Sequence, residues 1–281
     1  MKYTPITNKL VRPILKGGCM NIIVCIKQVP GSTNVNVDPI TGVLIRDGVD
    51  SKINPYDLYA LETALKLKED TLGKITALTM GPPMAKAIIK EAYMMGVDEG
   101  FILSDRKFAG ADVLATSYAI SQGVRTVSDY DLIICGKQTT DGDTAQVGPE
   151  LAEFLNIPHV ANVRKIIEIK DDSILVEMDM DHTIEIQEVK FPCLITVEKG
   201  IYTPRLPSYK KKLETLNKDI PIFNLSHMED KREEYYGLKG SPTQVERIFP
   251  PEKNSSKVIW NGNSEELIEK LSDKLRELKF V

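Results

Sequence analysis

The stretch Asp131-Leu-Ile-Ile-Cys-Gly-Lys-Gln-Thr-Thr-Asp-Gly-Asp-Thr-Ala-Gln-Val-Gly-Pro149 decides the fold of this chain. Residues 132–135 are apolar, as a central strand of a parallel sheet requires, and Gly136 ends that run. The residues that follow are mostly polar and contain two further glycines. A turn of this kind at the carboxyl end of a parallel strand offers unpaired backbone N–H groups, and α/β proteins place phosphates there. The alternative is an ordinary loop between a strand and a helix.

A helix is expected to begin within this stretch. Asp141, Asp143 and Thr144 are each suitable as its N-cap, and the residues from Pro149 to Leu155 favour a helix. A helix start next to the turn would add the positive end of a helix dipole, which strengthens the case for a phosphate site.

The bulk composition limits the possible functions. The 281 residues fit one large α/β domain, or one domain with an appendage. With 36 basic and 40 acidic side chains the net charge is −4, so no basic excess points to nucleic acid. No apolar run approaches the roughly 18 residues that would span a bilayer, so we expect no membrane insertion. The cysteines at 19, 25, 135 and 193 form no CxxC pair, which predicts a reduced, cytoplasmic protein without a structural metal.

Strand-like and helix-like segments alternate between residues 20 and 157. Asn54 and Pro55 open a helix, as the N-cap and the first helical residue. We expect strands over 21–26, 74–80, 99–103 and 131–135, helices over 85–95 and 112–122, and a hairpin over 35–49 with its turn at 39–42. This alternation predicts a doubly wound and mostly parallel sheet.

The pattern changes after Pro158. An antiparallel meander is expected over 163–169, 173–179 and 183–189, followed by a strand over 193–197, so that residues 20–199 form the α/β domain. Residues 200–263 lack a long periodic segment, yet they contain too many apolar residues for a pure linker. The choice is between a disordered linker and an extended arm that packs on another chain, and we favour the arm. A helix over 264–278, capped by Ser264, is expected near the end of the chain. Residues 200–281 would thus form a recognition loop and a C-terminal arm that ends in this helix.

Residues 1–19 differ in character from the rest. One hypothesis is that they form an extension absent from the native protein, because Lys16-Gly-Gly could be encoded by a ribosome-binding site just before a start codon at Met20. The rival hypothesis is a targeting peptide, although the segment lacks a continuous apolar region.

Five segments match the sequence pattern of one protein family, in the same order along the chain. They are Val24-Cys-Ile-Lys-Gln-Val-Pro30, Ile53-Asn-Pro-Tyr-Asp57, Ala77-Leu-Thr-Met-Gly-Pro82, the loop 136–148, and Thr196-Val-Glu-Lys-Gly-Ile-Tyr-Thr-Pro-Arg-Leu-Pro-Ser208. From Met20 to the C-terminus the sequence resembles the β subunit of electron-transfer flavoproteins. The resemblance implies a Rossmann-like domain that binds an adenine nucleotide. The implied cofactor-binding residues are Cys25, Asn54, Pro55, Tyr56, Asp57, Met80, Gly136, Lys137, Gln138, Thr139, Thr140, Asp141, Gly142, Asp143, Thr144, Ala145, Gln146 and Val147.

The resemblance leaves two cofactors open. Relay-type members hold a structural AMP in this pocket, whereas electron-bifurcating members hold FAD. Gly142 and Ala145 are similar to the bifurcating form, and small residues let the backbone approach a diphosphate. The same loop also occurs in relatives tied to nitrogen fixation. We therefore favour bifurcation, with AMP-only relay as the alternative.

For the bifurcating form, the resemblance implies a path for electrons between several partners. NADH would deliver a hydride to the FAD of this subunit. One electron would pass to ferredoxin or flavodoxin. The other would pass to a second FAD in the α subunit and then to an acyl-CoA or 2-hydroxy-acid dehydrogenase.

Individual residues then receive expected roles. Backbone N–H groups and hydroxyls of residues 139–144 would hold the diphosphate. Asp141 and Asp143 would cap N–H groups or accept hydrogen bonds from ribose hydroxyls. Lys27 and Lys137 would either neutralise phosphate charge or lie in solvent, and Cys25 would pack beside the adenine.

Partner recognition is assigned by the resemblance to residues 198–205. Ile201 would anchor the partner dehydrogenase, with Arg205 in the same loop, unless Ile201 is simply a core residue. From a different functional class, a non-catalytic adenine-nucleotide sensor would share the fold and the pocket without needing the arm. The sequence contains no Walker motif and no GxSxG motif, which disfavours a nucleotidase or a serine hydrolase.

Overall fold

The computed structural model describes residues 20–31, 36–37, 44–45, 51–127, 129–246 and 257–281. The expected extension 1–19 and the expected turn at 39–42 lie outside these residues, and two short strands, β3 (Asn36–Val37) and β4 (Leu44–Ile45), flank that turn. The chain divides into one compact unit that ends at Glu246 and a second unit that contains the C-terminal residues. The two units are described separately.

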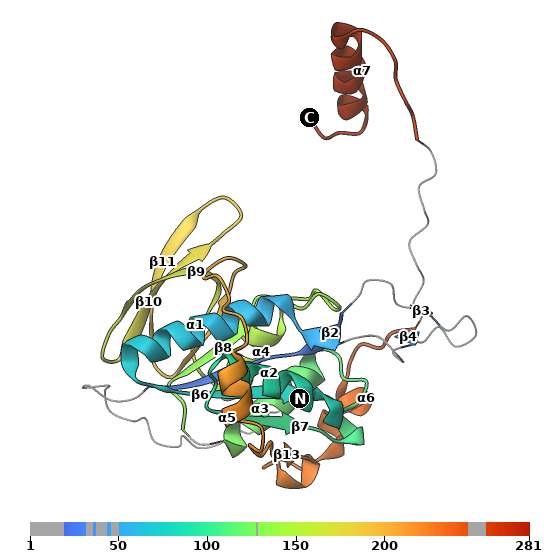
Figure 1. Ribbon diagram of the computed structural model, residues 1–281. Coiled ribbons are helices and arrows are strands. Elements are labelled where there is room, and N and C mark those ends of the chain that lie inside the picture. Colours follow the sequence, from blue (N-terminus) through green and yellow to red (C-terminus); the bar gives the residue numbers. More distant parts are fainter. Residues whose placement is uncertain (1–19, 32–35, 38–43, 46–50, 128, 247–256) are drawn as a thin grey trace. The chain divides into compact units, whose positions relative to one another are not determined.

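A nine-stranded sheet forms the centre of the first unit (Figure 1). In sheet order its strands are β11 (Ile184–Lys190), β10 (Ser173–Asp179), β9 (His159–Ile169), β12 (Cys193–Val197), β8 (Leu132–Gly136), β1 (Asn21–Cys25), β6 (Lys74–Met80), β7 (Glu99–Leu103) and β13 (Ile222–Phe223). The strands from β9 to β13 along this order pair in parallel, whereas β9, β10 and β11 pair antiparallel. Both the mostly parallel sheet and the antiparallel meander are confirmed.

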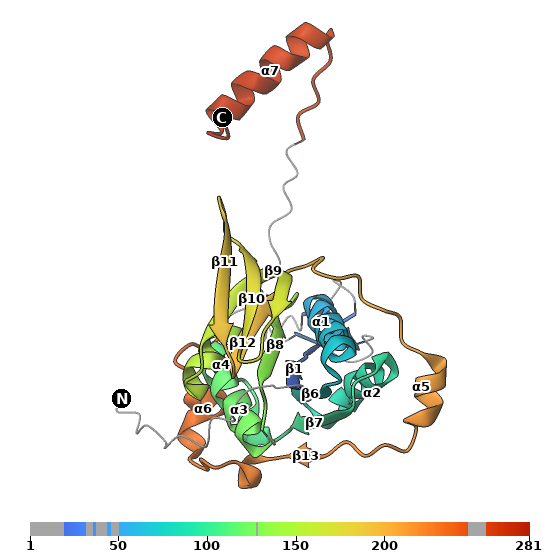
Figure 2. The ribbon, with the colours of Figure 1, turned by 90° about the vertical axis from the view of Figure 1, so that its left-hand side faces the viewer.

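Helices cover both faces of the parallel strands. Figure 2 shows α1 (Pro55–Thr71) and α2 (Lys86–Met95) on one face, with α3 (Val113–Thr126) and α4 (Val147–Leu155) on the other. The short helices η1 (Pro83–Ala85) and η2 (Arg106–Phe108) lie in the connections, and β2 (Gln28–Pro30) pairs antiparallel with β5 (Ser51–Ile53). This is the doubly wound arrangement that the alternation predicts.

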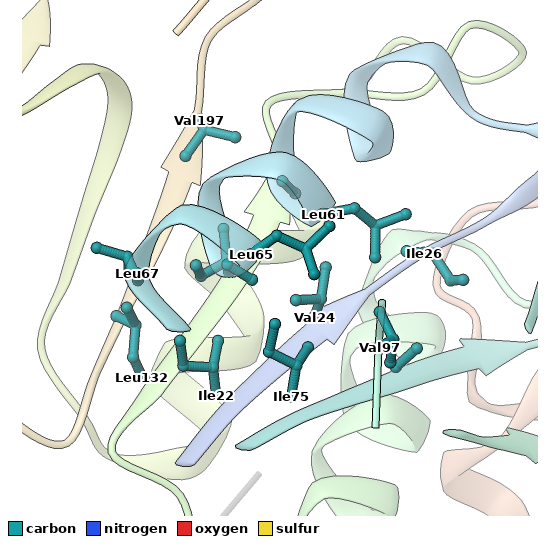
Figure 3. Packing of buried hydrophobic residues seen from close by; sticks show 14 of the residues in the cluster. Ile22, Val24, Ile26, Leu61, Leu65, Leu67, Ile75, Val97, Leu132 and Val197 are labelled. Atoms are coloured by element: carbon teal, nitrogen blue, oxygen red, sulfur yellow. The ribbon is translucent and has the colours of Figure 1, made fainter. Parts of the chain in front are cut away.

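The buried faces on both sides of the sheet explain why the middle of β1 is apolar. Ile22 and Val24 of β1 belong to the core cluster beneath α1, where Leu61 and Leu65 pack on them (Figure 3). Ile23, between them in the sequence, belongs to the cluster on the opposite face. Because successive side chains of a strand point to opposite faces, a strand covered on both sides has to be apolar at every position.

Residues 200–246 differ from the expected arm. They contain α5 (Tyr209–Glu214), β13, η3 (Leu225–His227), η4 (Glu233–Tyr235) and α6 (Gly237–Gly240). Ile220, Leu225 and Tyr236 are buried in the first unit, and β13 adds to the edge of the sheet beside β7. Apolar residues that we assigned to another chain therefore complete this chain's own core. Their contacts come from very short elements, which leave no periodic signal in the sequence.

The second unit contains the helix α7 (Ser264–Glu277). Asn263 occupies the N-cap position instead of the expected Ser264, and its side chain accepts a hydrogen bond of 2.9 Å from the N–H of Glu266. Within this unit Ile268, Leu271 and Leu278 are exposed. Among the helices of the described residues, none is long and apolar enough to cross a lipid bilayer.

Candidate functional site

The sheet has a topological switch point between β1 and β8. From β1 the chain continues to β6 and β7 on one side, and it then returns to β8 on the other side. The connections after β1 and β8 therefore diverge, and in doubly wound sheets such a switch point, at the carboxyl ends of the strands, is the usual position of the ligand-binding crevice. Cys25, Met80 and Gly136 end β1, β6 and β8, so the structure brings these expected site residues to one edge of the sheet.

Gly136 lets the start of α1 lie directly against the end of β8. A Cβ atom at this position would come within 2.5 Å of Asp57 Oδ1 and within 2.7 Å of the carbonyl carbon of Tyr56. Real Cβ atoms do not approach other atoms so closely, so only glycine allows this packing. The sequence marks Gly136 as the end of a strand, but it gives no sign of this contact with a helix 80 positions earlier.

Asn54 connects the start of α1 to the loop after β8. Its side chain is fully buried. The amide Nδ2 donates to the carbonyl oxygen of Gln138 at 2.9 Å, and Oδ1 accepts from the N–H of Thr140 at 3.2 Å. Asn54 thus occupies the expected N-cap position, yet among the described residues its side chain makes no capping bond to α1. The amide fixes the loop backbone from two sides instead.

Asp57 is a buried carboxylate beside this contact. Its Oδ2 accepts from the N–H of Lys27 at 2.7 Å, and it also bonds the Asn54 side chain and the N–H of Gly136. Burial raises the pKa of Asp57 to about 7, although these hydrogen bonds and the charge of Lys27 oppose the shift. Asp57 therefore joins the loops after β1 and β8 to the first turn of α1.

The raised pKa of Asp57 makes stability depend on pH. Between its ordinary value of 3.8 and about 7 the folded protein keeps this proton while the unfolded chain loses it, so stability falls as the pH rises through that window. Asp57→Asn should remove this contribution, up to about 4 kcal/mol across the window. Urea unfolding at several pH values measures it, with Asp70→Asn at the exposed end of α1 as the control. An unchanged pH slope in Asp57→Asn would contradict the assignment.

The loop before α4 has an irregular backbone. Asp143 and Ala145 have positive φ angles of 54° and 55°, and α4 begins only at Val147, with Gln146 at the N-cap position. The prediction that Asp141, Asp143 or Thr144 caps this helix was therefore wrong. A residue with positive φ at Ala145 followed by the right-handed Gln146 is the backbone combination that is typical of anion-binding nests, in which successive N–H groups point to one side.

The charged side chains of the loop are paired within the chain. Lys27 Nζ lies 2.8 Å from Asp141 Oδ1, and Lys137 Nζ lies 2.6 Å from Glu198 Oε1. Partial burial raises the pKa of Asp141, but the ion pair with Lys27, together with hydrogen bonds from Thr139 and the backbone, holds the pKa below its usual value. The Gln138 amide donates to Asp143. Both lysines thus offset carboxylates, which reduces the repulsion that a phosphate would meet at this loop.

The two glycines of the loop differ in their surroundings. A Cβ at Gly142 would meet only Thr139 Oγ1 among the described atoms, at an ordinary 3.4 Å, so the space around it is open. A Cβ at Gly148 would come within 2.4 Å of Thr196 Cγ2, which shows that the first turn of α4 lies tightly against β12. Gly148 was not among the expected site residues. Its role depends on a contact across the fold.

Neither of the two expected partner-binding residues is a fully exposed side chain that is free to contact another protein. Ile201 is half-buried and packs against the core cluster beneath α1. The guanidinium of Arg205 forms two hydrogen bonds of 2.9 Å with Glu62, and it lies 2.8 Å from Glu69. Arg205 is therefore engaged with α1. Sequence reasoning missed Glu62, and its only signal was a carboxylate next to the apolar stripe of a helix.

Comparison with known proteins identifies related chains. The sequence matches the family model for the electron transfer flavoprotein domain over residues 41–221. An electron transfer flavoprotein subunit beta from Thermoanaerobacterium thermosaccharolyticum is 45% identical over 264 residues, covering 93% of this chain and 100% of that protein. The caffeyl-CoA reductase-Etf complex subunit CarD from Acetobacterium woodii is 41% identical over 264 residues, with the same coverage. The acryloyl-CoA reductase electron transfer subunit gamma from Anaerotignum propionicum is 39% identical over 274 residues, again with 93% and 100% coverage.

Proposed function

Because the chain belongs to the electron transfer flavoprotein family and is related to its β subunits, we propose that it binds an adenine nucleotide in the crevice between β1 and β8. One observation carries this proposal. The loop after β8 is clamped by the buried Asn54 amide, and it ends in a nest of N–H groups at the start of α4. A fixed set of backbone donors at a helix start suits a phosphate or a diphosphate.

Within this proposal, FAD is the favoured nucleotide and AMP is the alternative. The open space around Gly142 and the small side chain of Ala145 would let a longer ligand pass close to the backbone. The N–H groups of residues 139–147 would hold its phosphates, and Lys27 and Gln138 would keep the two loop aspartates occupied. When bound, FAD would supply the chemistry that takes up electrons in pairs and releases them singly.

The proposed partners follow from the same reading. An α subunit with a second FAD would complete the carrier, NADH would be the donor, and ferredoxin or flavodoxin would be one acceptor. The other acceptor would be a dehydrogenase. Two relatives are named after reductases of CoA esters, which supports an acyl-CoA dehydrogenase over a 2-hydroxy-acid dehydrogenase as this acceptor. The exposed apolar side chains of α7 would serve as a contact with the α subunit.

Cofactor content tests the proposal directly. The chain is purified together with its α subunit, the complex is denatured, and the released nucleotides are separated and quantified. Two FAD per heterodimer would support the bifurcating form. One FAD with one AMP would support the relay form and refute bifurcation. A complex whose only adenine compound belongs to the α subunit would refute nucleotide binding in this crevice.

Ile201 provides a test of the partner surface. Ile201→Asp should lower electron delivery to the dehydrogenase at least tenfold, because a carboxylate would replace an apolar anchor, while NADH oxidation with an artificial acceptor continues. Steady-state rates with each acceptor measure the two activities. Leu206→Asp, at a side chain that is 88% exposed, controls for the added charge. Equal loss of both activities in Ile201→Asp would place Ile201 in the core and not in the interface.

A further inference from the structure

Cys25 and Cys135 are direct neighbours in the sheet. The parallel register of β1 and β8 places Cys25 opposite Cys135. Adjacent strands lie about 4.8 Å apart, and a disulfide spans Cα separations of roughly 4.4–6.8 Å. Both side chains belong to the same face, since Cys135 is part of the core cluster against which Cys25 packs.

The two thiols differ in accessibility. Among the described residues both are free, with Cys135 buried and Cys25 half-buried at the last position of β1. A small molecule that enters the crevice would therefore meet Cys25 first. The start of α4 lies over Cys135, because a Cβ at Gly148 would come 3.7 Å from the Cys135 Cβ.

We propose that Cys25 and Cys135 form an oxidisable dithiol at the mouth of the crevice, which a small disulfide converts into a Cys25–Cys135 disulfide. Cys25 as a thiolate attacks the oxidant's S–S bond, which gives a mixed disulfide and releases one thiol. Cys135 then attacks the Cys25 sulfur and releases the second thiol. The two cysteines lose two protons and two electrons, and the oxidant is reduced to two thiols.

The surroundings of Cys135 favour this order of events. The hydrogen bond with Cys25 and burial both raise the pKa of the Cys135 thiol, so Cys135 remains protonated in the resting protein. Cys25 is the accessible member of the pair. The dithiol role goes beyond the packing role that we expected for Cys25, and it would make the crevice sensitive to oxidation.

The link to ligand binding rests on the proposed function. The N–H groups proposed to hold phosphates extend to the start of α4, which lies against Cys135. A nucleotide bound there would cover the path by which an oxidant reaches Cys25. Disulfide formation is therefore expected to be fast in the empty protein and slow in the loaded protein.

The test uses the full chain, stripped of nucleotide, and 4,4′-dithiodipyridine as the oxidant. Lys16 and Lys27 bracket Cys19 and Cys25 in a single tryptic peptide, so all variants carry Cys19→Ser. The expected result is release of two thiopyridones for each disulfide formed, and a peptide that joins Cys25 to Cys135 after non-reducing digestion. The control variant Cys193→Ser, in a buried position of β12, should behave identically.

Three results would overturn the dithiol. They are a stable mixed disulfide at Cys25 with Cys135 present, a disulfide that involves Cys193, and no reaction of the native protein. The variant Cys135→Ser should stop at the mixed disulfide, which separates the two chemical steps.

A second arm repeats the oxidation with saturating AMP and then with FAD. At least a tenfold slower disulfide formation with either nucleotide is expected. If the disulfide forms as fast with AMP and with FAD as in the empty protein, the proposed nucleotide site is refuted and the dithiol is retained. If a nucleotide binds by calorimetry but the empty protein forms no disulfide, the dithiol fails and the proposed function stands.

Discussion

Arg205→Ala is expected to lower the free energy of unfolding by about 3–5 kcal/mol. The Glu62 side chain is only 3% exposed, and the Arg205 guanidinium is its charged partner through two bonds of 2.9 Å. Without the guanidinium, a buried carboxylate keeps one hydrogen bond, from the backbone N–H of residue 205. Urea unfolding measures the change as a shift of the midpoint at constant slope.

Two comparisons isolate the buried carboxylate as the cause. Adding Glu62→Gln to Arg205→Ala should restore most of the loss, because the neutral amide is far less costly to bury than an unpaired charge. Lys210→Ala should change stability by less than about 0.5 kcal/mol, since that lysine is 87% exposed and lies 3.9 Å from Glu214. A double variant as unstable as Arg205→Ala alone would show that the guanidinium acts by packing and not by charge.

Gly136→Ala should weaken nucleotide binding at least tenfold, a loss of about 1.4 kcal/mol or more, besides a destabilisation of about 1–3 kcal/mol. The added methyl group would overlap Asp57 and the backbone of Tyr56, so the first turn of α1 has to move away from β8. Asn54 would move with it and release the loop at Gln138. Calorimetric titration with AMP and urea unfolding measure the two effects.

Gly142→Ala is the matched control for Gly136→Ala. It introduces the same methyl group only six residues later, where the space is open. Its stability is expected to stay within about 0.5 kcal/mol of the parent protein. If Gly142→Ala and Gly136→Ala destabilise equally, the close approach of α1 to β8 is not the cause.

Local patterns sufficed to predict the regular part of the fold. The mostly apolar runs of β6, β7 and β12 predict their bounds, because strands covered on both faces consist largely of apolar residues. The start of α1 was also predictable, since Asn54 and Pro55 form a strong local signal. These elements depend on residues that lie next to one another in the sequence.

The features that the sequence did not predict depend on distant contacts or on backbone geometry. The pairing of Arg205 with Glu62 joins residues 143 positions apart and has no local signal. The positive φ angles of Asp143 and Ala145 delay α4 to Val147, although good N-cap residues stand earlier in the loop. For the candidate site, the residues themselves and their position at the carboxyl edge of the sheet were predictable. The hydrogen bonds of Asn54 to the loop and the lysine–carboxylate pairs were not.

Helix α1 has a consequence for electron transfer across the proposed complex. Its start carries the clamp on the loop after β8, and its body holds the segment around residue 205 through Glu62. Eight residues of α-helix separate these two attachments, which is a fixed spacing of about 12 Å along the axis. A cofactor in the crevice and a protein docked at residues 201–205 would both contact segments that are attached to α1. The tunnelling distance between them would then be set by a single helix and would change little when either end is displaced.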